Sequence, residues 1–135
     1  LIENGYGIII EREKVLVEQI KHVVVELVHE MNNVDSIVRK SEYLVERMNM
    51  SYQQISKLFS RHESITIEKY IISNKIERIK ELILTDEYTL SEIAFMMDYN
   101  SVQYLSTQFK SVAGISVSDF KKSGEMRKTP LEDLC

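Results

Sequence analysis

Neither glycine nor proline occurs between residues 8 and 113 of this 135-residue chain. Tight β-turns and breaks between strands depend on these two residues, so a stretch of this length without them predicts a series of helices. Asn, Asp and Ser would then form the helix ends at which Gly is usual. We therefore predict an all-α fold. Residues 1–10 are the exception, because two glycines followed by β-branched residues are typical of a turn and a short extended segment.

A second constraint is an internal repeat with a spacing of 50 residues, in which the pattern of residues 51–71 recurs over residues 101–121. A short amphipathic segment and a polar turn precede each copy. Helix, tight turn and helix in this order form a helix-turn-helix unit. The sequence therefore predicts two such units in one small domain.

Capping residues place the predicted helices along the chain. Ser51 and Ser101 begin the second helix of each unit, and Thr89 with Glu92 forms a capping box. Asp35 or Ser36 would cap the helix that ends at Met48. Asn49 and Asp98 would take the left-handed conformation in the two turns.

The predicted organisation has four parts. Residues 1–10 are an extended segment, which we interpret as the end of a missing upstream domain, and residues 11–34 form a helix that packs on the next part. One domain with both helix-turn-helix units covers residues 35–123, and residues 124–135 form a flexible tail. Within the domain we expect a first helix-turn-helix unit over 35–65, a linker helix over 66–85, a second unit over 89–114 and a last helix over 116–123.

Charge argues weakly against a nucleic-acid ligand, because the chain has a formal net charge of −4 and such proteins are usually basic. The charge is unevenly distributed, however. Residues 1–34 carry six acidic and three basic side chains, whereas residues 35–123 carry twelve of each. A neutral domain can still bind DNA if its charges are sorted between its faces, with few phosphate contacts and an affinity that salt readily weakens.

Several classes of function receive no support from the sequence. The single cysteine, Cys135, excludes a disulfide framework, and no apolar run approaches the length of a membrane span. We find no nucleophile–base pair, no glycine-rich phosphate loop and no paired carboxylates, so we predict no catalytic residues, no cofactor and no metal ligand. His22 and His29 are seven residues apart and are interpreted as part of a solvated acidic face. The chain begins with Leu1 and has no leader, so we interpret it as a piece of a longer protein, or as a processed chain, of the reducing cytoplasm.

The second helix of each unit carries the residues expected to read DNA, because a helix fits the major groove and presents its exposed side to base edges. Setting aside the predicted core residues (Ile55, Leu58, Phe59, Leu105, Phe109 and Val112) leaves the base-reading candidates Tyr52, Gln53, Gln54, Ser56, Lys57, Val102, Gln103, Tyr104, Ser106 and Thr107. The candidates for contact with the DNA backbone are Ser51, Ser91 and Ser101 at helix starts, together with Arg61 and Lys110. His62, beyond the first of these helices, is expected to be exposed, and a phosphate contact is the alternative.

Four phrases of the sequence resemble one known family. They are residues 55–59 (Ile-Ser-Lys-Leu-Phe), 76–83 (Ile-Glu-Arg-Ile-Lys-Glu-Leu-Ile), 90–94 (Leu-Ser-Glu-Ile-Ala) and 109–116 (Phe-Lys-Ser-Val-Ala-Gly-Ile-Ser). Residues 49–122 resemble the DNA-binding domain of AraC/XylS-type bacterial transcription regulators. The resemblance implies about seven helices and recognition helices in successive major grooves, on the order of 34 Å apart. It also implies double-stranded DNA and RNA polymerase as partners in transcription regulation.

The chain departs from the family pattern at several positions. The glycine usual in each turn is replaced by Asn49 and Asp98, both of which tolerate the left-handed region. A basic residue common in the second recognition helix is replaced by Thr107, which weakens the case for guanine reading by that helix. The first unit, with Lys57 and Arg61, is therefore expected to contribute more of the affinity.

The sequence leaves two questions open, the origin of residues 1–10 and the function of the domain. Residues 1–10, followed directly by a long helix, are similar to the end of a heavy-metal-associated ferredoxin-like domain. In that case the chain would be the regulator half of a fusion protein whose metal ligands lie upstream. The other interpretation is that residues 1–10 are an ordinary connector. For function, the main alternative is a helical protein-interaction module without DNA binding, in which the acidic first helix docks a partner. An enzyme is a distant third hypothesis.

Overall fold

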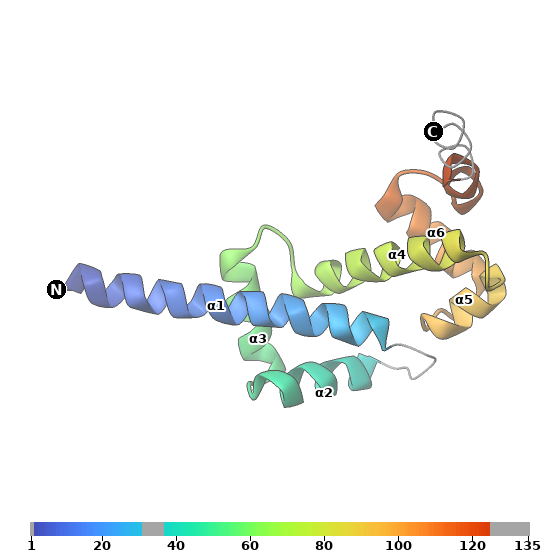
Figure 1. The fold of residues 1–135 in the computed structure, drawn as a ribbon. Helices are drawn as coiled ribbons and strands as arrows, with labels where there is room; N and C mark the ends of the chain where they lie inside the picture. Colours follow the sequence, from blue (N-terminus) through green and yellow to red (C-terminus); the bar gives the residue numbers. More distant parts are fainter. Residues whose placement is uncertain (1, 31–36, 125–135) are drawn as a thin grey trace. The chain divides into compact units, whose positions relative to one another are not determined.

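The computed structural model describes residues 2–30 and 37–124, and every regular element in these ranges is a helix (Figure 1). The labelled helices are α1 (Ile2–His29), α2 (Ile37–Met48), α3 (Tyr52–His62), α4 (Ile67–Thr85), α5 (Leu90–Met96) and α6 (Val102–Ala113). A seventh helix covers residues 117–124. The predicted all-α class is confirmed for the described ranges. None of these helices is long and apolar enough to cross a membrane.

The prediction of an extended segment over residues 1–10 was wrong, because α1 already begins at Ile2. Extending an existing helix adds one backbone hydrogen bond per residue, whereas a lone strand leaves its backbone groups without a ladder partner. The helical pattern of residues 11–29 therefore propagates back through Gly5 and Gly7. The resemblance to the end of a metal-binding domain depended on a strand, and residues 2–10 form none.

The predicted helix starts are confirmed at three positions. The Ser51 hydroxyl accepts a hydrogen bond from the Gln54 N–H (3.2 Å), and the Ser51 N–H donates to Gln54 Oε1 (3.0 Å). Thr89 and Glu92 form the same reciprocal capping box, with distances of 3.1 and 2.8 Å. The Ser101 hydroxyl accepts from the Tyr104 N–H at 3.0 Å. Because each cap satisfies backbone donors that lack helical partners, it fixes the residue at which the helix begins.

Positive φ values mark the ends of the helices. Asn49 and Asp98 have φ of 56° and 65°, as predicted, and Asp86 follows α4 with φ of 59°. Gly114 ends α6 with φ of 86°, a conformation that costs glycine little. The predicted cap at residues 35–36 and the predicted flexible tail, apart from residue 124, lie outside the described residues.

The chain divides into two compact units. Among the described residues, unit 1 comprises residues 2–30 and 37–74, and unit 2 comprises residues 75–124. The division falls within α4, after Asn74. Unit 1 thus contains α1, α2 and α3 with the beginning of α4, and unit 2 contains the remainder.

Unit 1 is built around α1, which packs against both α2 and α3. Its fully buried side chains come from all these helices and include Val17, Ile20, Val24, Val28, Leu44, Ile55, Phe59 and Ile67. Phe59 of α3 packs against Tyr70 of α4 with ring centroids 5.2 Å apart. The contact holds the second helix of the first helix-turn-helix unit against the beginning of α4.

In unit 2, α5 packs against α6. The core of this unit includes Ile76, Ile79, Ile93, Met97, Leu105 and Phe109. Phe109 of α6 packs edge-on against Phe120 of the last helix, with centroids 5.7 Å apart. This aromatic pair has the same spacing in sequence as Phe59 and Tyr70. Val112 was predicted to belong to the core but is 43% exposed, because no neighbour among the described residues covers it.

Candidate nucleic-acid interface

The exposed side of each second helix carries three polar residues in one line. The α3 stripe consists of Gln53, Lys57 and Ser60, and the α6 stripe consists of Gln103, Thr107 and Lys110; all six are exposed. Spacings of four and three residues place each set on one face of its helix. The two stripes correspond position by position in the repeat. Ser60 was not among the predicted reading residues, although its alignment with Lys110 could have identified it.

The remaining base-reading candidates of α3 make contacts within unit 1 or are partly buried there. Gln54 is a member of the capping box described above. The Tyr52 hydroxyl donates a hydrogen bond to Glu68 Oε2 on α4 at 2.7 Å, and burial, followed by this bond, raises the pKa of Tyr52 well above its ordinary value. Ser56 is half-buried. These three residues therefore flank the α3 stripe or support it.

The remaining α6 candidates lie beside the α6 stripe. Val102 and Ser106 are half-buried, whereas Tyr104 is exposed. The Thr107 hydroxyl donates to the Gln103 carbonyl at 2.9 Å, so its donor is engaged within the helix. Ser91 is exposed near the start of α5, and its role in contacting DNA stays a prediction.

A buried lysine supports the turn in front of α6. Lys75 is only 5% exposed, and its Nζ lies 4.0 Å from the ring centroid of Tyr99. The Tyr99 ring also packs 5.6 Å from Tyr104, and its hydroxyl donates to Gln108 Oε1. Burial raises the pKa of Tyr99. Cation–π and aromatic contacts of this kind fix orientation, so the cluster positions the beginning of α6. We had not predicted it.

The end of α3 is bound to α1 by charged groups. Arg61 Nη1 lies 2.7 Å from Glu13 Oε2, and His62 Nε2 lies 2.8 Å from Glu13 Oε1. The hydrogen bond with His62 and the charge of Arg61 hold the pKa of Glu13 below its ordinary value. A second ion pair joins Lys21 Nζ to Glu63 Oε1 at 3.1 Å. His62 was expected to be exposed, but this contact with α1 leaves its side chain only 16% exposed.

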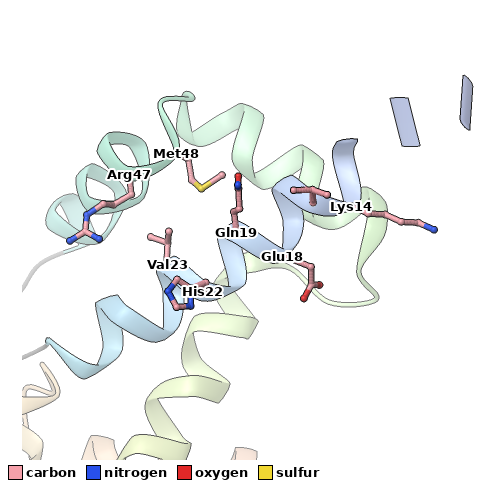
Figure 2. Close-up of a pocket in the computed structure, with 8 residues that line it drawn as sticks. Lys14, Glu18, Gln19, His22, Val23, Arg47 and Met48 are labelled. Atoms are coloured by element: carbon pink, nitrogen blue, oxygen red, sulfur yellow. The ribbon is translucent and has the colours of Figure 1, made fainter. Parts of the chain in front are cut away.

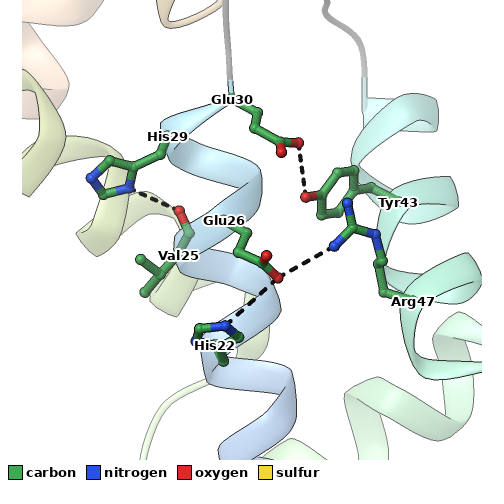
Figure 3. A network of polar contacts seen from close by, with 7 residues as sticks. All are labelled: His22, Val25, Glu26, His29, Glu30, Tyr43 and Arg47. Atoms are coloured by element: carbon green, nitrogen blue, oxygen red, sulfur yellow. Dashed lines mark hydrogen bonds and ion pairs between the residues drawn. The ribbon is translucent and has the colours of Figure 1, made fainter.

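A polar network joins α1 to α2 (Figure 3). Arg47 Nη1 donates to Glu26 Oε1 at 3.3 Å, and the Tyr43 hydroxyl donates to Glu30 Oε2 at 2.8 Å. The Arg47 guanidinium carbon also lies 4.5 Å from the centre of the Tyr43 ring. Burial and the bond to Glu30 raise the pKa of Tyr43 to about 12. Helix α1 therefore holds both helices of the first helix-turn-helix unit.

A shallow groove of ≈ 650 Å³ lies between α1 and the end of α2 (Figure 2). Its lining combines the apolar side chains of Val15, Val23 and Met48 with the polar side chains of Lys14, Glu18, Gln19, His22 and Arg47. No residue of the α3 stripe lines it. In the described part of the chain, no group of three His, Cys, Asp or Glu residues is arranged to hold a metal ion.

The fold agrees with a comparison against known families. The sequence profile of a helix-turn-helix domain matches residues 44–123, which is more than half of the chain and includes α3 to α6. The chain belongs to the AraC-type helix-turn-helix family. This family consists of DNA-binding transcription regulators. Helix α1, including Glu13, lies outside the matched residues.

Curated relatives of this AraC-type domain are longer proteins. The chain is 28% identical to the transcriptional activator RhrA of Rhizobium meliloti (strain 1021) over 81 residues, which are 58% of this chain and 26% of that protein. It is 24% identical to the Msm operon regulatory protein of Streptococcus mutans serotype c (strain ATCC 700610 / UA159) over 79 residues, or 58% of this chain and 28% of that protein. The chain thus spans about a quarter of the length of these relatives.

Solved structures show the same fold. The C-terminal domain of AraT, a response regulator from Geobacillus stearothermophilus, superposes with a TM-score of 0.63 at 22% identity, covering 80% of this chain and 84% of that one. A DNA-binding transcriptional dual regulator from Escherichia coli K-12 superposes with a TM-score of 0.65 at 15% identity, covering 79% and 93%. At these identities the likeness concerns the fold alone.

Proposed function

We propose that the chain binds double-stranded DNA in a sequence-specific manner through α3 and α6 and thereby regulates transcription. The observation that carries the proposal is the correspondence of the two stripes. Gln53 and Gln103 occupy the same position in the first turn of helices that begin at serine caps. A glutamine there suits bidentate pairing with adenine, and Lys57 and Lys110 suit guanine or phosphate.

We further propose that the two helices enter adjacent major grooves on one face of the duplex. Helix α4 runs from the unit of α3 to the unit of α6 and has 19 residues, which correspond to roughly 28 Å at 1.5 Å per residue. This length approaches the repeat of about 34 Å along B-form DNA. The free N–H groups at the starts of α3 and α6 would support phosphate contacts made by Ser51 and Ser101.

The proposal is tested by selecting bound sites from random duplexes and then measuring variants on the selected site. Lys57→Ala combined with Gln103→Ala should abolish specific binding, since each base contact contributes about 1–3 kcal/mol. Because both side chains are exposed, the melting temperature should hardly change. Lys14→Ala combined with Gln19→Ala is the matched control, because it removes the same two residue types from the exposed surface of α1. Equal loss in both double variants, or loss of the fold, would refute the assignment.

The salt dependence of the affinity distinguishes DNA binding from the alternative function, a protein-interaction module that does not bind DNA. DNA affinity should fall steeply as salt rises, because binding releases counterions. An apolar docking contact should change little with salt. A selection that enriches no duplex would favour the module. RNA polymerase as a partner, and a metal ion bound by an upstream domain, remain predictions.

A further inference from the structure

Glu13 of α1 contacts the end of α3, the proposed DNA-reading helix, although Glu13 lies outside the matched family region. One carboxylate oxygen binds Arg61 and the other binds His62, at 2.7 and 2.8 Å. The Glu13 side chain is 24% exposed, whereas that of Arg61 is 59% exposed. The contact thus brings an acidic group to the solvent-facing flank of α3, where DNA phosphates would approach.

The second cation of α3 is therefore already paired. Arg61 follows Lys57 by four residues, which places the two side chains on neighbouring positions of one helix face. Lys57 has no ion-pair partner among the described residues, whereas Arg61 has one. A phosphate approaching Arg61 must compete with the Glu13 carboxylate and is repelled by its charge.

We propose that α1 is a regulatory arm, in which Glu13 withholds Arg61 from the DNA backbone until the first turns of α1 are displaced. This inference rests on the proposed DNA binding by α3. Displacement would separate the carboxylate from Arg61 and so add one cation to the α3 surface. The affinity and salt dependence of DNA binding would both increase.

The attachment of α1 is suited to such movement. C-terminal to Glu13, α1 is held in place by the Lys21–Glu63 ion pair and by the hydrogen bonds that Glu26 and Glu30 accept from α2. The N-terminal turns of α1 extend beyond α2 and α3 (Figure 1). Ile8 and Ile9, which precede Glu13 in the chain, are 54% and 56% exposed. A force on these turns therefore acts on Glu13 before it reaches the fixed half.

The test measures binding of the selected duplex by fluorescence anisotropy at several salt concentrations. Glu13→Gln removes the charge but keeps the size of the side chain, and it should tighten binding about tenfold at low salt, as expected for one charge-assisted contact. The slope of log affinity against log salt should steepen by about 0.9, the value for one released counterion. Glu11→Gln is the matched control, since Glu11 is exposed on α1 and has no ion pair with the described residues. It should change the affinity less than about twofold.

A double-mutant cycle assigns the effect to Arg61. Arg61→Ala should cost about tenfold more affinity in the Glu13→Gln background than in the wild-type background. Equal losses in the two backgrounds would overturn the proposal, as would weaker binding by Glu13→Gln. Glu13→Met provides a second uncharged side chain of similar length; if both variants unfold, the contact is structural and the arm is refuted. If no variant and no wild-type protein binds DNA, the proposed function fails instead.

Discussion

Phe109→Ala tests whether packing of the buried face of α6 holds the α6 stripe in its exposed position. Phe109 is fully buried and meets Phe120 edge-on at 5.7 Å. Replacing a buried Phe by Ala typically costs about 3–5 kcal/mol, of which the aromatic pair contributes about 0.5–1.5 kcal/mol. A small domain has only about 5–15 kcal/mol of stability in total. We therefore expect unit 2 to become marginally stable.

Hydrogen exchange read by mass spectrometry locates this loss. Amides of α5 and α6 should exchange much faster in Phe109→Ala, while those of α2 and α3 should keep their protection, because they belong to unit 1. Phe95→Ala is the control in the same unit, since Phe95 is 59% exposed and its loss should cost less than about 0.5 kcal/mol. The reasoning fails if the two variants are equally stable, or if both units lose protection together.

Three further predictions concern local features. Asn49→Ala should cost about 1 kcal/mol in urea unfolding, because Asn49 has φ of 56° and alanine is strained there; Asn49→Gly should cost less, and the reverse order would exclude this cause. Ser101→Ala should also cost about 1 kcal/mol through the lost cap of α6, and an unchanged urea midpoint would show that the cap is dispensable. The folded pKa of Glu13 lies below 4.5, so its stabilising effect is complete above pH 4.5 and disappears as the pH falls through the folded value. The melting temperatures of wild type and Glu13→Gln should therefore converge in acid, and a constant gap would contradict the linkage.

The sequence predicted the features that depend on neighbouring residues. Ser51 and Thr89 cap their helices through residues three positions away, and Asn49 takes a positive φ for reasons contained in its own side chain. The repeat, together with the core residues predicted from the helical pattern, then placed Gln53 and Gln103 at corresponding exposed positions. Such signals are local or duplicated, so a single chain is enough to read them.

Contacts between distant residues were not predictable in this way. Glu13 meets Arg61 across 48 residues, and nothing in the pattern of α1 distinguishes Glu13 from its other acidic residues. Lys75 and Tyr99 likewise meet only because α4 and the turn before α6 pack together. A helical pattern shows which face is apolar, but it does not show which neighbour covers that face.

The most direct test of two linked reading helices is the affinity for the selected duplex after base pairs are inserted between its two half-sites. A five-base-pair insertion turns one half-site by about half a helical turn, and a ten-base-pair insertion restores its face but adds about 34 Å. If α4 fixes the spacing of α3 and α6, both insertions should reduce the affinity to that of a single half-site. Undiminished binding to either duplex would contradict the account.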